Sequence, residues 1–302
     1  MTKYSVLAIG INSTKKDKAK IQKKLKLDNI DLDVASIKDI LFKIIDGKII
    51  ALIDGKDFKK YNYVLIQSGW NTTHMAYLLH LYLKSNNILH NKPNTHSTKL
   101  SDIFFIASKG ISVPNTFFQN GLKIDSKEIL NIEEICKLPC IYKTLLGSLG
   151  TSVYLIDSTE KIKDMIRKNG KYNRYIFQEF ISNDFDYRVV VANNKASSVC
   201  KRTRVEDKYR NNVALGATED FINIEDTPQE VIDIAVEASR ALKLNWAGVD
   251  VVTDNHTNKN YVLEVNRRPG LTEKSSEVIA LYSYIKELSS KRETLPLTKL
   301  LK

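Results

Sequence analysis

Three oxygen-bearing side chains near the ends of two consecutive strand-like segments are the strongest candidates for chemistry in this sequence. Asp250 lies in the apolar segment GVDVV, and Glu264 and Asn266 lie in YVLEVN. Residues two apart in a strand face the same side, so Glu264 and Asn266 can approach one site while the neighbouring strand brings Asp250 beside them. Such oxygen ligands suit Mg²⁺. Solvent-facing strand ends are the alternative, but burying a carboxylate between valines without a partner is costly, which favours a metal site.

A lysine followed by a glycine-rich loop suggests phosphate binding. Lys143 ends a strand-like segment, and the loop GSLGTS follows at 147–152. Backbone N–H groups of such a loop can close over phosphates, and Lys143 adds a positive charge nearby. The loop is not a Walker A motif, because no Gly-Lys-Ser/Thr ends it and a strand follows. Taken alone, this loop is more often a plain hairpin connection.

A hydrophobic strand with polar residues at its exit comes next along the chain. YIFQEFI at 175–181 carries Gln178 and Glu179 where the strand ends, and Asp186 and Arg188 follow. This exit can present backbone groups to a nucleotide base and a carboxylate to a ribose. It is equally compatible with a simple strand whose end is exposed.

The arginines gather in one part of the chain. Only ten of the 46 basic residues are Arg, and none precedes Arg167. The guanidinium fork suits carboxylates and phosphates better than the Lys point charge does. The cluster therefore predicts anionic ligands, although charge runs are also common on solvated faces. The residues concerned are Arg188, Arg202, Arg204, Arg210, Arg267 and Arg268, with Asn211 and Asn212.

Alternating strand-like and helix-like segments must position these side chains. The first ninety residues read as a small α/β unit with strands at 5–10, 42–53 and 63–69 and a helix at 72–85, the second strand region turning at Asp46-Gly47. Later segments predict helices at 97–109, after 158, at 228–243 and at 275–289. Residues 139–158 read as a strand, a Gly/Ser-rich loop and a second strand, and further strands are expected at 175–181, 186–192, 196–204, 247–252 and 261–266. The helix at 228 is signalled by Thr227 as N-cap, Pro228 and Glu230.

Composition bounds the class of protein. The chain has 302 residues, a formal net charge of +11 and 43% hydrophobic residues, which predicts a folded protein of about two domains. Cys136, Cys140 and Cys200 cannot all pair, so a reduced, cytoplasmic location fits best. The most apolar stretch, MAYLLHLYL at 75–83, is too short to span a membrane. The excess of Lys is weak evidence for nucleic acid as a partner.

The order of these motifs is more specific than any one of them, and it is similar to that of the ATP-grasp superfamily. Within it, the chain resembles the RimK-type carboxylate–amine ligases, which add amino acids such as glutamate to a peptide or small-molecule carboxylate. The resemblance covers residues 90 to 275 and rests on Lys99 in STKLSDIFFIASKG, Lys143 with its loop, QEFI at 178–181, DYR at 186–188, RNN at 210–212, GVDVV at 248–252 and LEVNRRPG at 263–270.

The resemblance implies an α/β (α+β) ATP-grasp fold with a small N-terminal α/β pre-ATP-grasp domain. The expected domains are 1–92 for that domain, 93–181 for a central subdomain with the glycine-rich lid, and 182–302 for a C-terminal subdomain with the Mg²⁺-binding strands. The first ninety residues resemble the superfamily only in length and α/β pattern.

The resemblance also implies roles for individual residues. Lys99 and Lys143 match the lysines that contact ATP phosphates, Asp186 helps hold the nucleotide, and Asp250, Glu264 and Asn266 match the Mg²⁺ ligands. The remaining nucleotide-binding positions are Gly147, Ser148, Gly150, Thr151 and Ser152 in the lid, Gln178, Glu179, Phe180 and Ile181 at the hinge that reads adenine, and Arg210 and Asn212 facing the phosphates. Catalytic roles fall to Arg210 and Arg268, and substrate binding to Arg188, Arg202, Arg204, Asn211 and Arg267.

The implied reaction uses ATP and Mg²⁺, with Mn²⁺ as an alternative ion. A substrate carboxylate attacks the γ-phosphate to give an acylphosphate and ADP, and an amine then displaces phosphate to form an amide. No protein nucleophile is required, which agrees with the lack of an evident Ser-His-Asp or Cys-His arrangement. The implied partners are ATP, a carboxylate acceptor and an amino-acid amine, with an acidic amino acid such as glutamate favoured and a homo-oligomer allowed.

At two places the sequence departs from the family pattern, so the residues that bind the acceptor substrate are not determined by the resemblance. Arg267 and Arg268 fill positions where the family often has small residues, and NNVALGA lacks a second glycine. Two other functions stay open at this point. The enzyme could modify a ribosomally made peptide, or the scaffold could be a non-catalytic protein that binds nucleotides or polyanions.

Overall fold

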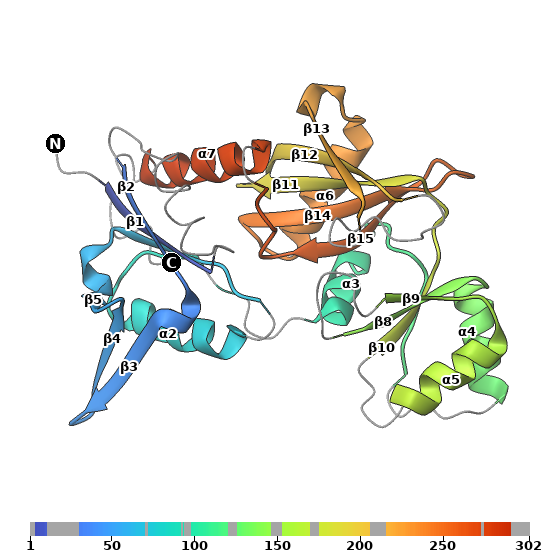
Figure 1. The fold of residues 1–302 in the computed structure, drawn as a ribbon, viewed down its shortest axis with the longest axis horizontal. Helices are drawn as coiled ribbons and strands as arrows, with labels where there is room; N and C mark the ends of the chain where they lie inside the picture. The colour runs from blue at the N-terminus through green and yellow to red at the C-terminus, as the bar shows by residue number, and fades with distance from the viewer. Residues whose placement is uncertain are drawn as a thin grey trace. The chain divides into compact units, whose positions relative to one another are not determined.

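The computed structural model describes residues 4–10, 30–69, 72–91, 93, 98–119, 126–145, 153–169, 175–205, 216–272 and 275–290. The chain divides into two compact units (Figure 1). We call residues 1–96, 245–247 and 267–302 the N-terminal unit, and residues 97–244 and 248–266 the second unit. Helices and strands alternate through both, which confirms the mixed α+β class expected from the sequence.

A three-stranded parallel sheet forms the centre of the N-terminal unit. Its strands are β1 (Tyr4–Ile9), β2 (Ile30–Ala35) and β6 (Tyr63–Ile66), in the order β2-β1-β6. The central strand β1 is buried along Val6–Ile9 and β6 along its whole length, as expected for parallel strands that are covered on both faces. Helix α2 (Thr73–Ser85) follows β6, and two short 3-10 helices, η1 (Ile37–Asp39) and η2 (Phe58–Lys60), lie in the connections.

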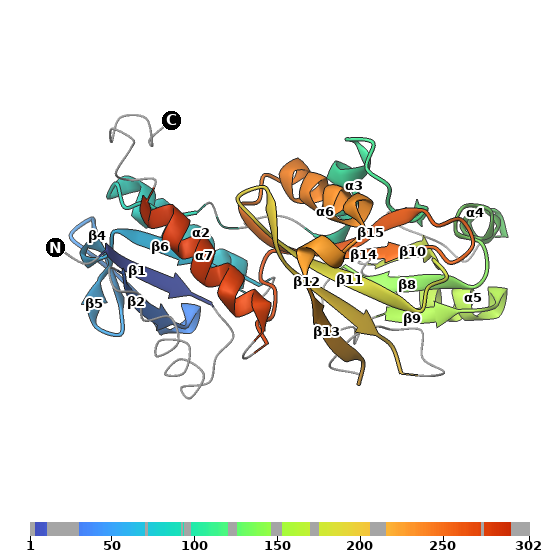
Figure 2. The same ribbon diagram turned by 90° about the horizontal axis from the view of Figure 1, so that it is seen from above.

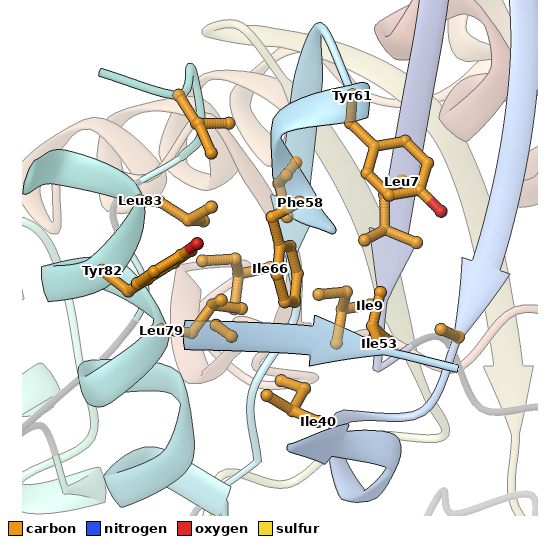
Figure 3. Close-up of a cluster of buried hydrophobic side chains, with 14 of the residues drawn as sticks. Leu7, Ile9, Ile40, Ile53, Phe58, Tyr61, Ile66, Leu79, Tyr82 and Leu83 are labelled. Carbon is orange, nitrogen blue, oxygen red and sulfur yellow. The ribbon is translucent and has the colours of Figure 1, made fainter. Parts of the chain in front are cut away.

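An antiparallel hairpin stands beside this sheet. It contains β3 (Ile40–Ile45), β4 (Lys48–Ile53) and the short β5 (Lys56–Asp57). Asp46 and Gly47 both have positive φ, 49° and 73°, as a two-residue primed turn requires. This confirms the hairpin that the Asp-Gly pair predicts. Figure 3 shows the apolar core shared by the two sheets and α2, in which Leu79, Tyr82 and Leu83 of the helix face Ile53, Phe58 and Ile66.

The C-terminal helix α7 (Ser276–Ser290) belongs to the N-terminal unit. The ring of Tyr284 stacks on Trp246 with 5.4 Å between centroids. Tyr284 also lies against Tyr63 of β6, so α7 covers one face of the parallel sheet (Figure 2). The family resemblance places this helix in the C-terminal subdomain at 182–302. The boundaries of that subdomain stay a prediction.

The second unit contains two antiparallel arrangements. The first is a four-stranded sheet in the order β7-β10-β8-β9, with α4 (Ser126–Cys136) and α5 (Thr159–Asn169) packed on it through a shared apolar core. Its strands are β7 (Thr116–Phe117), β8 (Cys140–Thr144), β9 (Val153–Ile156) and β10 (Tyr175–Glu179).

The second arrangement is a five-stranded sheet in the order β13-β12-β11-β14-β15. Its strands are β11 (Phe185–Ala192), β12 (Lys195–Thr203), β13 (Thr218–Ile222), β14 (Trp246–Thr253) and β15 (Asn260–Asn266), and η6 (Ile224–Asp226) precedes α6. Helices α3 (Lys99–Ala107) and α6 (Gln229–Ala241) pack against β15. Because β14 lies between β11 and β15, residues far apart in the sequence meet on this sheet.

Helix α6 begins one residue later than its capping pattern predicts. Pro228 occupies the N-cap position, and the Thr227 hydroxyl instead donates to the carbonyl oxygen of Asn223 at 3.1 Å.

Among the helices of the described ranges, none is both long and apolar enough to cross a membrane.

Candidate functional site

The strand register brings the three oxygen-bearing side chains together. Asp250 on β14 lies opposite Glu264 on β15, and Asn266 lies two residues further on, opposite Gly248. The Asn266 Nδ2 donates to Asp250 Oδ2 at 3.3 Å. This is the juxtaposition that the sequence pattern predicts. Two carboxylates and an amide oxygen are hard donors that fit Mg²⁺, although no three His, Cys, Asp or Glu side chains cluster within the described ranges.

Arg188 holds the Asp250 carboxylate from the neighbouring strand β11. Its Nε donates to Asp250 Oδ1 at 2.8 Å and its Nη2 to Oδ2 at 2.9 Å. Arg202 on β12 forms the same two-bonded fork with Asp186, at 2.7 and 2.8 Å, and its Nη2 also lies 3.2 Å from Asp250 Oδ1. Bidentate pairs of this kind fix orientation as well as charge. Asp250 is thus braced by two guanidinium groups.

The four charges of this network are mostly removed from water. The side chains of Arg202 and Asp186 are 5% and 7% exposed. Burial opposes ionisation of Asp250, but Arg188 and then Arg202 outweigh it and lower the pKa of Asp250 to about 2. Asp250 is therefore a carboxylate at neutral pH. In the ligand-free protein, the negative charge of Asp250 is balanced by the guanidinium groups of Arg188 and Arg202.

The family resemblance implies that Arg188 and Arg202 bind the substrate and that Asp186 helps to hold the nucleotide. In the structure, the forks of both arginines are engaged by carboxylates. Arg204 is more accessible, and its Nη2 lies 3.6 Å from the exposed Asp184. Substrate binding by these residues stays a prediction.

A second group of cations approaches the same carboxylates from the four-stranded sheet and α3. The Lys143 Nζ donates to Gln178 Oε1 at 2.6 Å, and Gln178 Nε2 donates to Thr116 Oγ1 at 3.0 Å. Lys99 at the start of α3 lies 3.9 Å from Glu264. Burial lowers the pKa of Lys143 to about 8, with Glu264 opposing and Lys99 reinforcing this shift. The two lysines therefore share one carboxylate.

A small pocket lies beside this group, between α3 and β15. Its lining includes Lys99, Asp102 and Glu264, together with apolar residues of both elements. Charged groups and apolar walls are thus combined at one place in the second unit. Such a combination is typical of sites that bind small polar molecules.

The expected hinge follows β10 directly. The Glu179 N–H donates to the carbonyl oxygen of Asn115 at 2.8 Å, which ties the exit of β10 to the segment before β7. Gln178 is buried and holds Lys143, and Ile181 is buried, whereas Phe180 is half-buried. Recognition of adenine by this segment stays a prediction. The role of Thr116 as a support for Gln178 was missed, because it depends on pairing of β7 with a strand sixty residues away.

Several expected site residues lie outside the described residues or belong to the N-terminal unit. The lid residues Gly147, Ser148, Gly150, Thr151 and Ser152, and Arg210, Asn211 and Asn212, lie outside the described residues. Arg267 and Arg268 follow β15 and belong to the N-terminal unit. Burial lowers the pKa of Arg268. The catalytic and substrate-binding roles assigned to these residues stay predictions.

Comparison with known sequences identifies the family. The profile of the RimK-like ATP-grasp domain matches residues 96–283, more than half of the chain. A "Probable alpha-L-glutamate ligase" of Trichodesmium erythraeum is 32% identical over 176 residues, which are 57% of this chain and 56% of that protein. A "Probable alpha-L-glutamate ligase 1" of Hahella chejuensis is 30% identical over 209 residues, 67% of this chain and 66% of that protein. The chain thus spans little more than half the length of the first of these relatives.

Comparison with solved structures supports the same fold. The ATP-grasp ligase PsnB complexed with a minimal precursor superimposes with a TM-score of 0.68 at 17% identity, covering 96% of this chain and 100% of that one. A further PsnB structure, with minimal precursor, Mg and ADP, gives a TM-score of 0.64 at 18% identity, with 95% and 100% coverage. Because the matching profile covers more than half of the chain, the chain belongs to the RimK-like ATP-grasp family.

Proposed function

We propose that this protein is an ATP- and Mg²⁺-dependent ligase that joins a carboxylate to an amine through an acylphosphate. The observation that carries the proposal is the meeting of Lys99 and Lys143 with the carboxylates of Glu264 and Asp250 in the second unit. Cations that can take phosphates stand beside oxygen donors that can take a divalent ion. This pairing is what binding of a metal–triphosphate complex requires.

Lys143 and Lys99 are poised to receive phosphate oxygens. The low pKa of Lys143 shows that its charged form lacks full compensation in the ligand-free protein. A triphosphate supplies that compensation, and Lys143 then gains a stronger partner than the neutral Gln178 amide. The Lys99 ammonium can exchange its 3.9 Å contact with Glu264 for a phosphate, which frees that carboxylate for the metal.

Asp250, Glu264 and Asn266 would hold Mg²⁺, which would neutralise charge on the β- and γ-phosphate oxygens. Arg188 and Arg202 act on Asp250 as positioning residues, since each contacts this carboxylate. Their fixed forks keep the Asp250 oxygens in one orientation while a ligand exchanges. Because these cations already balance Asp250, Mg²⁺ should bind well only together with the negatively charged nucleotide.

The protein contributes to the reaction by positioning and charge. A substrate carboxylate attacks the γ-phosphorus, the bond to ADP breaks, and the lysines offset negative charge as it moves onto the leaving phosphate oxygens. The acylphosphate is then attacked by an amine, and phosphate leaves as the amide forms. Arg210 and Asn212 keep their proposed contacts with the phosphates, and Arg210 and Arg268 keep their proposed catalytic roles.

An acidic amino acid, with glutamate favoured, is the proposed amine substrate, and the carboxylate belongs to a peptide, a protein or a small molecule. The glutamate ligase names of the relatives and the arginine-rich second unit support this choice. A second candidate is modification of a ribosomally made peptide. The likeness to a ligase complexed with a precursor supports that candidate.

One experiment tests the proposal and separates its two forms. Purified protein, ATP and Mg²⁺ are incubated with candidate peptides, with and without glutamate. ADP release is measured, and the masses of the peptides are determined by mass spectrometry. A gain of one condensed glutamate supports glutamate ligation. A loss of water without glutamate indicates bond formation within the peptide. ATP turnover that is unchanged in Glu264→Gln protein would contradict the proposed metal site.

A further inference from the structure

The parallel sheet of the N-terminal unit has a topological switch point between β1 and β6. The chain runs from β1 outward to β2 and returns to place β6 on the other side, giving the order β2-β1-β6. Open parallel sheets characteristically bind ligands just beyond the carboxyl ends of their strands at such a point. In this unit, Gly10 follows β1 and Gln67 follows β6 at that position.

The backbone at this point is fixed by three close contacts. The Gln67 N–H donates to the carbonyl oxygen of Ile9 at 2.9 Å, and the Gly10 N–H donates to that of Ala35 at 3.0 Å. Gly10 has φ +82°, and a Cβ there would lie 1.9 Å from the Gln67 carbonyl oxygen. Only glycine allows this approach, so the position of Gln67 is set by the sheet rather than by a free loop.

From the alternation of side chains along β6, we infer that the Gln67 side chain lies on the face of the sheet opposite to the core of Figure 3. Residues alternate along β6, and Val64 and Ile66 both belong to that core. Continuing the alternation places Gln67 on the same face as Tyr63 and Leu65. This is the face that α7 covers through Tyr284.

The carboxamide of Gln67 has no hydrogen-bond partner among the described residues. The residue is 2% exposed, and both Oε1 and Nε2 are buried and unpaired. Its neighbour Asn91 shows the usual arrangement, because its amide accepts from the Ile66 N–H at 2.6 Å and donates to the Ile66 carbonyl at 2.9 Å. A buried amide left unpaired is costly, so its presence at a switch point indicates that a partner is missing.

The chemistry of the missing partner follows from the amide and its surroundings. A carboxamide offers donors and an acceptor in one plane, so its full complement is a neutral planar group with an adjacent N–H and C=O. The residues that end the three strands, Ile9, Ala35 and Ile66, are apolar. A carboxylate or phosphate offers acceptors only, so it could accept from Nε2 but would leave Oε1 without a donor.

From these observations we propose that the carboxyl edge of the N-terminal sheet is a binding site for the amide group of a peptide, read by the side chain of Gln67. The proposal goes beyond the ligase reaction and does not depend on it. Both polar atoms are closed to solvent, so a peptide reaches them only when the residues that cover them move.

NMR of the full-length protein tests this site. The side-chain NH₂ resonances of Gln67 are assigned by their loss in Gln67→Met protein and followed during titration with the uncharged peptide N-acetyl-triglycine amide. Parallel titrations use acetamide and sodium acetate. We expect saturable shifts with the peptide, weaker shifts with acetamide and none with acetate. Peptide affinity, followed through backbone signals of neighbouring residues, should fall about tenfold or more in Gln67→Met protein.

Three results would overturn the proposal. They are Gln67 signals that ignore the peptide, equal peptide affinity in Gln67→Met protein, and shifts caused by acetate alone. The first result would mean that a trapped water fills the site. Thermal unfolding of Gln67→Met protein verifies that it is folded, and Gln67→Asn, which keeps the amide but shortens its reach, provides a second variant should Gln67→Met fail to fold. Because neither ATP nor Mg²⁺ is present, the outcome is independent of the proposed ligase reaction.

Discussion

Two buried glutamines, one in each unit, show how differently the two units treat polar groups. Gln178 is 1% exposed, accepts a hydrogen bond from Lys143 and donates one to Thr116. Gln67 is 2% exposed, and neither polar atom of its side chain has a partner within the described residues. Gln178 thus belongs to a hydrogen-bonded network of the second unit that includes Lys143. Gln67 lies at the edge of the parallel sheet of the N-terminal unit, without such a network in the part of the chain that the structure describes.

The largest effect is expected from removing the Asp250 carboxylate, which pairs with two arginines of the second unit. Asp250→Ala leaves Arg188 and Arg202 without their shared partner, and we expect ATP turnover to fall about a hundredfold or more. Stability should fall by about 3–5 kcal/mol, since breaking a buried pair leaves charges uncompensated. Chemical denaturation and ADP release measure the two effects.

Two controls separate the roles of charge and fold. Asp184 also lies beside an arginine but is 73% exposed, so Asp184→Ala should change stability by less than about 1 kcal/mol. Glu264→Gln alters the proposed metal site at a half-exposed side chain and should lose activity with little change in stability. Equal stability of the Asp250→Ala and Asp184→Ala proteins would contradict the picture of a buried network.

The two glutamines can be compared directly by the same substitution. Gln178→Met removes the acceptor of Lys143 and the donor to Thr116, so we expect a loss of about 1–3 kcal/mol. Gln67→Met removes no described hydrogen bond and keeps a similar volume, so unfolding by denaturant should change by less than about 0.5 kcal/mol or show a gain. A similar loss in both proteins would show that Gln67 is already satisfied in the free protein.

Local pattern predicted the parts of this arrangement that depend on neighbouring strands. The hairpin at Asp46-Gly47 and the pairing of Asp250 with Glu264 connect segments close in the sequence, where turn chemistry and two-residue alternation decide the geometry. The engagement of Arg188 by Asp250 was not predictable in this way. It requires β14 to lie next to β11, an order that no local periodicity encodes.

The same limit explains the other differences. The Gln178–Thr116 contact spans 62 residues, and α7 packs with a sheet formed at the other end of the chain. At α6, a competing contact of Thr227 with the Asn223 carbonyl displaced the expected cap. Lys143 was singled out by the glycine-rich loop that follows it, and Lys99 only by the family resemblance, since a lysine in a Lys-rich chain carries little information by itself.

The pH dependence of ATP binding tests the role of Lys143 in the second unit. Burial lowers the pKa of Lys143 to about 8, so in the free protein its ammonium loses its proton as the pH rises through 8. Phosphates favour the ammonium, and ATP affinity should therefore fall by up to about tenfold per pH unit above 8. Calorimetric titration with ATP at pH 7, 8 and 9 measures this, and Lys143→Met should bind weakly with a flatter profile. Constant affinity of the unaltered protein from pH 7 to 9 would rule out Lys143 as a phosphate ligand.

The smallest expected effect concerns a pair of histidines in the N-terminal unit, His80 and His90. His90 Nδ1 lies 2.6 Å from the Ile88 carbonyl and His90 Nε2 lies 2.8 Å from His80 Nδ1. A neutral His90 satisfies both contacts by donating to Ile88 and accepting from His80.

Burial lowers the pKa of His90, so the unfolded chain takes up a proton below about pH 6.5 that the folded protein resists. Stability from this residue is therefore present above that pH and lost as the pH falls towards the lower folded-state pKa. Thermal unfolding at pH 7, 6 and 5 should show a smaller decline in His90→Gln than in the unaltered protein, whereas His256→Gln, at an exposed position of the second unit, should leave the decline unchanged. If the stability of His90→Gln protein follows the same pH dependence as that of the unaltered protein, then titration of this buried imidazole does not control the stability of the N-terminal unit. In that case Lys143, in the second unit, would be the only one of these two buried groups whose protonation matters.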